Sequence, residues 1–172
     1  TMPWVLLLIF VIRGLTLPGA LQGVNFYLTP NWKELLNPAL WHAAISQVFF
    51  SLTVGFGVMI AYASFLPEGS DIVNNSILIA LADAATAFVS GFAVFSTLGY
   101  YAQLQGVQVS EVMKSGPELA FVTYPTIISK LPLASLFGVL FFLMLLTLAI
   151  DSAFSLVEAF VAALMDKFGI RR

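Results

Sequence analysis

The sequence predicts an all-α membrane protein, on the basis of its composition, its hydropathy and the length of its apolar stretches. Hydrophobic residues make up 60% of the 172 positions and charged residues only 9%, and the mean hydropathy is +0.97. Soluble domains carry about 25% charged residues, so this composition excludes an ordinary soluble enzyme. Helices are expected because a lipid-exposed backbone must satisfy its own hydrogen bonds, and several apolar stretches reach the roughly 20 residues that a spanning helix needs.

The chain divides into one cut helix, three membrane spans and two long connections. The expected elements, in order, are the end of one helix at 2–21, a connection at 22–38, spans at 39–65 and 77–102, a helical loop at 103–131 and a span at 132–165. Prolines make the first connection irregular, and a loop as long as the second is usually functional or packed on itself. Because the first helix is cut, we expect residues 1–172 to be a segment of one transmembrane domain in a larger protein.

The basic C-terminal tail orients the spans. Cytoplasmic ends of membrane proteins are enriched in Lys and Arg, so the tail is expected in the cytoplasm, and by alternation 22–38 and 103–131 lie outside the cell. Arg13 and Lys33 would then also lie outside, which runs against the same rule. The basic residues of the tail are Lys167, Arg171 and Arg172.

Charge and cysteine content exclude other classes of protein. Seven Lys and Arg against nine Asp and Glu give a net charge of −2, so there is no basic excess for binding nucleic acid. The absence of cysteine excludes disulfides, cysteine-ligated metals and thiol catalysis, and a single histidine excludes any site that needs two. We therefore expect no enzyme and no nucleic acid partner.

Acidic residues inside the spans mark the place to look for function. Each costs about 3 kcal/mol near the bilayer centre unless it faces a partner or a water-filled path. At about 100° per residue, Asp151, Ser155 and Glu158 share one face of the last span, and Asp83 and Ser90 share one face of the preceding span. Ion binding or proton relay is the favoured interpretation, and hydrogen bonding between helices is the alternative.

A weak point for a helix lies in the middle of the span 39–65. Gly55 and Gly57 flank Phe56, directly after the β-branched pair Thr53 and Val54. Each glycine lowers helix stability by about 1 kcal/mol relative to alanine. The helix could unwind here, which frees carbonyls for cations and amides for a carboxylate, or the glycines could let another helix pack closely. This motif alone supports both interpretations equally.

Several motifs together resemble a known family. They are RGLTLPGA at 13–20, YLTPNW at 27–32, QVFFSLTVGFG at 47–57, FVSGF at 88–92, LGY at 98–100 and AIDSAF at 149–154. Over essentially the whole chain they resemble the neurotransmitter:sodium symporter family, most closely its bacterial members that carry bulky hydrophobic amino acids, tryptophan included. The resemblance implies an inverted-repeat transporter bundle with one discontinuous, unwound helix, of which this chain supplies helices five to eight. It also implies that 103–131 is an extracellular plug over the substrate path.

The resemblance implies two sodium sites, a substrate pocket and a gate. Ser51 and Asp83 are implied ligands of the first sodium ion, and the Leu148 carbonyl, Asp151 and Ser152 are implied ligands of the second. Oxygen ligands with one carboxylate at each site suit a hard cation. The implied substrate-pocket residues are Phe50, Ser51, Thr53, Gly55, Phe56, Ser152 and Leu156. The implied gate residues are Asp166 and Tyr62.

Two positions depart from the family pattern. Asp83 stands where most members have an amide, and Ala87 stands where chloride-dependent members have a serine. A chloride ion would be repelled by Asp83, so we expect chloride independence with Asp83 supplying the fixed negative charge. The function implied is sodium-coupled symport of a hydrophobic L-amino acid, with tryptophan and leucine as candidates. It would take place by alternating access in the cell membrane, specifically the plasma (inner) membrane of a bacterium, with the lipid bilayer and the remaining helices of the transporter as partners.

Two other classes of protein remain open. An intramembrane aspartyl protease could pair Asp83 with Asp151 as two carboxylates sharing a proton, although the Gly-x-Gly-Asp surroundings of such proteases are absent. A cation channel could use the same two residues without alternating access. Saturable, concentrative flux in fixed proportion to Na⁺ would separate symport from both.

Overall fold

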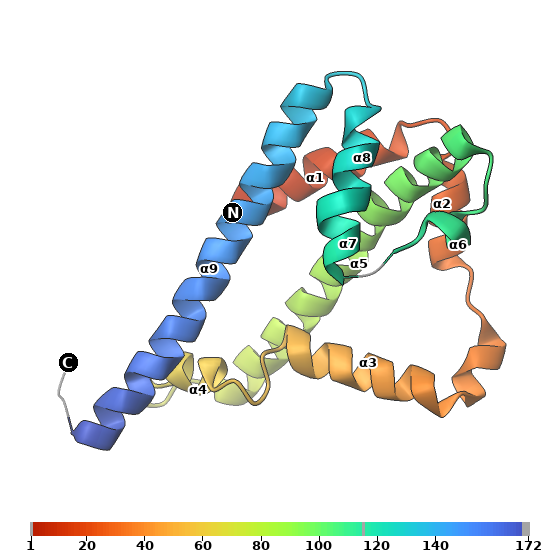
Figure 1. Ribbon diagram of the computed structural model, residues 1–172. Coiled ribbons are helices and arrows are strands. Elements are labelled where there is room, and N and C mark those ends of the chain that lie inside the picture. The colour runs from red at the N-terminus through yellow and green to blue at the C-terminus, as the bar shows by residue number, and fades with distance from the viewer. Residues whose placement is uncertain (1, 115, 170–172) are drawn as a thin grey trace. The chain divides into compact units, whose positions relative to one another are not determined.

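A computed structural model describes residues 2–114 and 116–169. The regular elements of these residues are all helices, which confirms the all-α class. In order they are α1 (Met2–Leu15), α2 (Ala20–Leu28), the 3₁₀ turn η1 (Trp32–Leu36), α3 (Pro38–Ser51), α4 (Val58–Ala63), α5 (Ile72–Gln105), α6 (Val109–Val112), α7 (Gly116–Glu118), the π-helical η2 (Leu119–Thr123), α8 (Tyr124–Ser129) and α9 (Ala134–Phe168) (Figure 1). Arg171 and Arg172, on which the expected orientation partly rests, lie outside the described residues.

Two helices are long and apolar enough to cross a membrane on their own. They are α5, with 34 residues, which contains the span expected at 77–102, and α9, with 35 residues, which begins two residues after the start of the span expected at 132–165. At about 1.5 Å per residue each exceeds the roughly 30 Å core of a bilayer. A bent pair, α1 with residues 20–36, has the length and composition of a third span if its two parts cross as one, with an angle of 111° at the break. The chain is therefore that of a multi-pass membrane protein.

The helix expected at 2–21 ends instead at Leu15, and a separate helix, α2, occupies much of the expected connection 22–38. Pro18 has no amide to donate, and Gly19 adopts a left-handed φ of +81°, so the backbone cannot continue the helix through them. The span expected at 39–65 is also divided, because α3 ends at Ser51 and α4 begins at Val58. The discontinuous helix is thereby confirmed.

The chain forms two compact units. The first unit comprises residues 2–30 and 86–148, and the second comprises 31–85 and 149–169 among the described residues. The long helices α5 and α9 contribute residues to both units.

The core of the first unit joins the loop 103–131 to the helices around it. Tyr124 of α8 stacks on Phe141 of α9 with ring centroids 5.2 Å apart, and its hydroxyl accepts a hydrogen bond from Thr97 of α5 at 3.2 Å. Burial raises the pKa of Tyr124 above its ordinary value, against the opposing effect of the Thr97 hydrogen bond. The Tyr100 hydroxyl donates to the Lys130 carbonyl at 3.1 Å. The loop is thus packed into the unit and is not a free connection.

A cap fixes the start of α5 in the second unit. The Asp71 carboxylate accepts hydrogen bonds from the backbone amide of Asn74, at 3.0 Å, and from its side chain. These hydrogen bonds lower the pKa of Asp71 below its ordinary value. Asp and Asn are both preferred at such N-cap positions, because their side-chain oxygens satisfy amides that have no intrahelical partner.

Glycines bring α2 and α5 into backbone contact in the first unit. A Cβ atom added to Gly23 would overlap the Phe95 carbonyl and lie 2.9 Å from the amide nitrogen of Gly99. A Cβ added to Gly99 would in turn collide with the backbone of Gly19 and Gly23. Small residues at such a crossing are the usual means of close helix packing in membranes.

We expect Gly23→Ala to destabilise the protein by about 2 kcal/mol, because backbone atoms must move apart to admit the methyl group. Gly138→Ala is the matched control, since its added Cβ would meet only the Ile128 side chain at 3.9 Å. Thermal unfolding of the full-length protein in detergent measures both variants. Equal melting temperatures for the two would show that the backbone contact is not formed.

Candidate sodium and substrate site

The break between α3 and α4 is an unwound segment, residues 52–57, within the second unit. Thr53, Gly55 and Gly57 adopt positive φ angles of 53°, 93° and 77°. A Cβ on either glycine would meet nothing within 4 Å in the described chain, and the positive φ angles are in themselves a reason for glycine at both positions. Of the two interpretations that the sequence left open, the structure supports unwinding.

Thr53 is the strained residue of this segment. A left-handed φ is an outlier for a β-branched side chain and costs about 1–3 kcal/mol, and such strain gathers at ligand sites. The unwinding also frees acceptors, because among the backbone hydrogen bonds of the described residues none reaches the carbonyls of Leu52, Val54 or Gly55. A set of oxygen atoms is therefore available for a ligand in the middle of a membrane helix.

Ser51 and Asp83 meet beside this segment. The Ser51 hydroxyl, on the last residue of α3, donates to the Asp83 carboxylate of α5, with oxygen distances of 2.8 and 2.9 Å to its two oxygens. The two residues are 32 positions apart in the sequence, and the fold brings them together. The two residues implied as ligands of one ion are thus brought into direct contact.

A cavity of about 470 Å³ opens next to this pair in the second unit. Its walls come from the unwound segment and its flanks, from α5 and from the C-terminal half of α9. The lining residues are Phe50, Ser51, Leu52, Thr53, Phe56, Val58, Met59, Tyr62, Ile79, Asp83, Asp151, Ser152, Ser155 and Leu156. Every residue implied for the substrate pocket lines it except Gly55, and every residue implied for the sodium sites lines it except Leu148.

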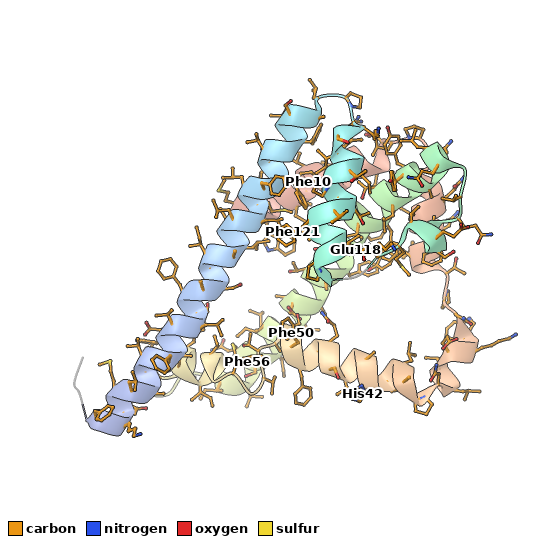
Figure 2. The ribbon with its side chains drawn as sticks, in the orientation of Figure 1. Phe10, His42, Phe50, Phe56, Glu118 and Phe121 are labelled. Atoms are coloured by element: carbon orange, nitrogen blue, oxygen red, sulfur yellow. The ribbon has the colours of Figure 1, made fainter. Side chains whose placement is uncertain are left out.

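Aromatic rings stand at one side of this cavity. Phe50 and Phe56 approach edge to face with centroids 6.1 Å apart, and Figure 2 shows both rings at the break between α3 and α4. Both side chains are more than half exposed, so their faces are open to a ligand. Edge-to-face pairs of this kind favour contact with apolar and aromatic groups.

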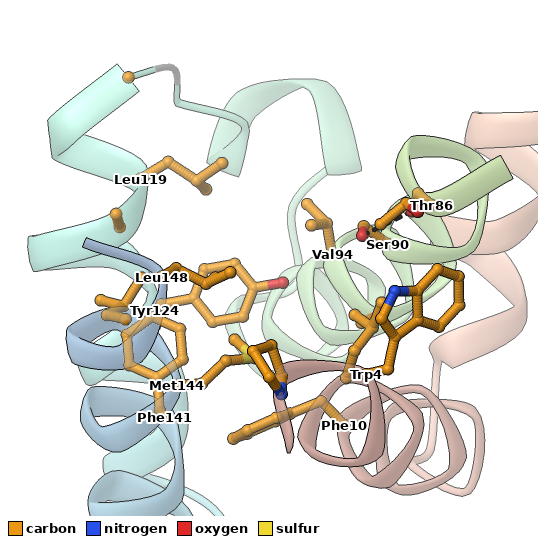
Figure 3. A pocket seen from close by; sticks show the side chains of 16 residues that line it. Trp4, Phe10, Thr86, Ser90, Val94, Leu119, Tyr124, Phe141, Met144 and Leu148 are labelled. Carbon is orange, nitrogen blue, oxygen red and sulfur yellow. Dashed lines mark hydrogen bonds between the residues drawn. The ribbon is translucent and has the colours of Figure 1, made fainter. Parts of the chain in front are cut away.

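Leu148 and Asp166 line other cavities. The Leu148 side chain faces an almost wholly apolar cavity of about 300 Å³ in the first unit, together with Phe10, Tyr124 and Phe141 (Figure 3). Asp166 lines a separate cavity of about 470 Å³ in the second unit, between α4 and α9, which Phe56 and Leu156 also border.

Ser155 is a site residue that the sequence analysis did not assign. Its Oγ lies 2.6 Å from the Tyr62 hydroxyl, which joins α4 to α9 directly, and it donates to the Asp151 carbonyl at 3.0 Å. The signal was present in the sequence, because Ser155 lies one helical turn after Asp151 on the polar face of the last span. Only the position of α4 reveals that Tyr62 is its partner.

The donor set at this site suits a hard monovalent cation. No group of three or more His, Cys, Asp and Glu side chains gathers as a metal site anywhere in 2–114 or 116–169. The cavity offers instead carboxylate oxygens from Asp83 and Asp151 and hydroxyls from Ser51 and Ser152, beside the free carbonyls of the unwound segment. Oxygen ligands with little net charge fit Na⁺ better than a transition metal.

Comparison with known proteins gives consistent results. The model of the sodium:neurotransmitter symporter family matches residues 1–172. An uncharacterized sodium-dependent transporter of Methanocaldococcus jannaschii is 48% identical over 168 residues, which cover 97% of this chain and 34% of that protein. The sodium- and chloride-dependent creatine transporter 1 of Homo sapiens is 43% identical over 166 residues, or 96% of this chain and 26% of that protein. The crystal structure of MhsT in complex with L-phenylalanine matches with a TM-score of 0.79 and 36% identity, over 98% of this chain and 36% of that one.

The fold of this chain, with its broken helix, matches that of the transporter MhsT. The chain belongs to the sodium:neurotransmitter symporter family. Its relatives are transporters and not enzymes, so the aspartyl protease alternative is excluded. The chain spans about a third or less of the length of the relatives it matches.

Substitution of Gly57 tests why the helix is broken between α3 and α4. We expect Gly57→Ala to destabilise the full-length protein by about 1–2 kcal/mol, because an L-residue with a Cβ is strained in the left-handed region. Gly57→Asn should cost less despite its larger side chain, because asparagine tolerates this conformation. Thermal unfolding in detergent compares the two. A greater loss with asparagine than with alanine would mean that lack of space, and not backbone conformation, requires the glycine.

Proposed function

We propose that this chain is part of a sodium-coupled symporter that carries a hydrophobic L-amino acid across the plasma membrane of a bacterium by alternating access. The observation that carries the proposal is the contact of Ser51 with Asp83 beside the unwound segment 52–57, in a cavity that Asp151 and Ser152 also line. Relatives in both an archaeon and a mammal are named as sodium-dependent transporters.

Two sodium ions are proposed to bind in contact with this chain. Ser51 and Asp83 would ligate the first, which replaces the hydrogen bond of the Ser51 hydroxyl to the carboxylate by contact of both side chains with the ion. The Leu148 carbonyl, Asp151 and Ser152 would ligate the second, and their spacing of three and four residues on α9 supports this, because it places them on one helix face. Each ion would be matched by one carboxylate, which limits the charge buried in the membrane.

A hydrophobic substrate is supported by the cavity walls. Phe50, Phe56 and Leu156 are apolar, and Thr53 and Ser152 add hydroxyls that can orient a polar group. Gly55, in the unwound segment, would present its backbone to the carboxylate of the amino acid. Tryptophan and leucine are the candidate substrates. The similar protein MhsT was solved in complex with L-phenylalanine, which is also a hydrophobic amino acid.

Access to the site is proposed to alternate between two gates. Asp166 and Tyr62 would form part of the cytoplasmic gate, since both border cavities between α4 and α9. The loop 103–131 would act as the extracellular plug, and its packing through Tyr124 gives it the rigidity that such a role requires. Sodium binding would hold the broken helix in one arrangement and so couple the ion gradient to substrate movement.

Chloride independence follows from the charge of Asp83. A carboxylate in the cavity supplies a fixed negative charge and repels a second anion, and Ala87 has no hydroxyl with which to bind one. The creatine transporter of Homo sapiens, named as chloride-dependent, is the relative from which the protein would differ here.

We expect the full-length protein in liposomes to take up labelled tryptophan or leucine under an inward Na⁺ gradient, saturably and equally well in chloride and in gluconate. Asp83→Asn should reduce this uptake about tenfold or more, because hydrogen bonds and ion contacts to a charged group contribute about 1.5–3 kcal/mol. Asp71→Asn is the matched control, since it makes the same substitution at the start of the same helix, outside the cavity, with a residue that also caps.

Two results would contradict the proposal in different ways. Uptake that requires chloride as well as Na⁺ would leave symport intact and overturn the role of Asp83. Flux that does not saturate, or that never exceeds the external concentration, would favour a channel over a symporter.

A further inference from the structure

Two hydroxyl groups of the cavity take no part in the proposed sodium sites. Tyr62 of α4 and Ser155 of α9 both line it, and their oxygen atoms lie 2.6 Å apart. The residues beside them in the cavity lining include the apolar side chains of Met59, Ile79 and Leu156. Tyr62 is 45% exposed, so its side chain is open to a ligand. A polar pair thus stands among apolar walls.

The direction of the hydrogen bonds decides what this pair can recognise. A serine hydroxyl has one hydrogen, and Ser155 donates it to the Asp151 carbonyl at 3.0 Å. Tyr62 must therefore be the donor in its contact with Ser155, which uses the single hydrogen of the phenol. Both hydrogens are then committed, while each oxygen keeps a lone pair. The pair offers acceptors to a ligand and no donor.

We propose, on the basis of the symporter function proposed above, that Tyr62 and Ser155 select a substrate side chain that is apolar except for one hydrogen-bond donor. The indole N–H of tryptophan and the hydroxyl of tyrosine have this chemistry. A side chain ending only in acceptors meets the lone pairs of both oxygens and is disfavoured. A purely apolar side chain enters but displaces water from an acceptor without replacing its hydrogen bond, which weakens its binding.

A pair of isosteric ligands tests the selection. Tryptophan and β-(3-benzothienyl)alanine share ring size and shape, and only tryptophan carries the ring N–H. Each is used to compete against uptake of labelled leucine by the full-length protein in liposomes under a Na⁺ gradient. We expect tryptophan to inhibit about fivefold more strongly, as one net hydrogen bond allows. The ratio of the two inhibition constants is unaffected by the amount of active protein in each preparation.

Substitutions at Tyr62 and Ser155 test whether this hydroxyl pair is responsible for the selection. Tyr62→Phe with Ser155→Ala removes both oxygens and should bring the ratio close to one. Ser155→Ala alone frees the Tyr62 hydrogen to bind an acceptor. The ratio of inhibition constants should therefore shift severalfold in favour of 4-cyanophenylalanine, which ends in an acceptor, over phenylalanine. Ser76→Ala is the matched control, because Ser76 also donates to the carbonyl four residues before it, on α5 and outside the cavity. Its ratios should equal those of the unmodified protein.

The outcomes separate this inference from the proposed function. Sodium-driven leucine uptake with a tryptophan-to-isostere ratio near one in the unmodified protein overturns the selection and leaves symport standing. A ratio of about five that persists in the double variant shows that other groups recognise the N–H, which also overturns it. If none of these amino acids is taken up under a sodium gradient, the proposed function itself is overturned. If the double variant does not fold, the cyano comparison with Ser155→Ala decides the question.

Discussion

The interruption of one membrane helix at residues 52–57 is the constraint on which the rest of the site depends. A spanning helix normally satisfies every backbone group within itself, and each group left unsatisfied in hydrocarbon costs several kcal/mol. Here three carbonyls have no amide partner among the described residues, and Thr53 is held in a left-handed conformation that a β-branched residue rarely adopts. Such an arrangement persists only where a polar ligand, water or charged side chains compensate. The cavity beside it supplies charged side chains, through the carboxylates of Asp83 and Asp151.

The charge of the site follows from the same constraint. An ionised Asp83 carboxylate can only accept hydrogen bonds. The Ser51 hydroxyl donates to it and lies within hydrogen-bond distance of both of its oxygens. A cation that replaces this hydrogen bond neutralises the carboxylate and gives the serine oxygen a second role as a ligand. Under the proposed function, binding of the ion would order the broken helix, because the proposed ligands lie at the end of α3 and on α5 and the free carbonyls follow directly in the chain. This linkage is the physical basis for coupling an ion gradient to a change of conformation.

Much of this arrangement could be predicted from the sequence, because membrane spans and buried charges give strong signals. The apolar stretches located α5 and α9, and the glycines flanking Phe56 indicated a weak point where the helix is indeed broken. The end of the first helix at Leu15 was missed, although Pro18 and Gly19 mark it in the sequence: the proline has no amide to donate and the glycine adopts a left-handed φ. The positive φ of Thr53 could not be predicted, because its residue type argues against it. The contact of Tyr62 with Ser155 depends on where α4 lies beside α9, and no spacing in a single sequence specifies that.

Hydrogen exchange of the backbone amides of residues 52–57 tests the central claim most directly. It is measured by mass spectrometry on the full-length protein in lipid nanodiscs, in Na⁺ and in K⁺ at equal ionic strength, alongside the Asp83→Asn variant. The account predicts that Na⁺ slows exchange in this segment relative to K⁺ and that the variant loses the difference, because the ion orders the unwound backbone only through its contact with Asp83. Equal exchange in Na⁺ and K⁺, or a sodium effect that the variant retains, would contradict it.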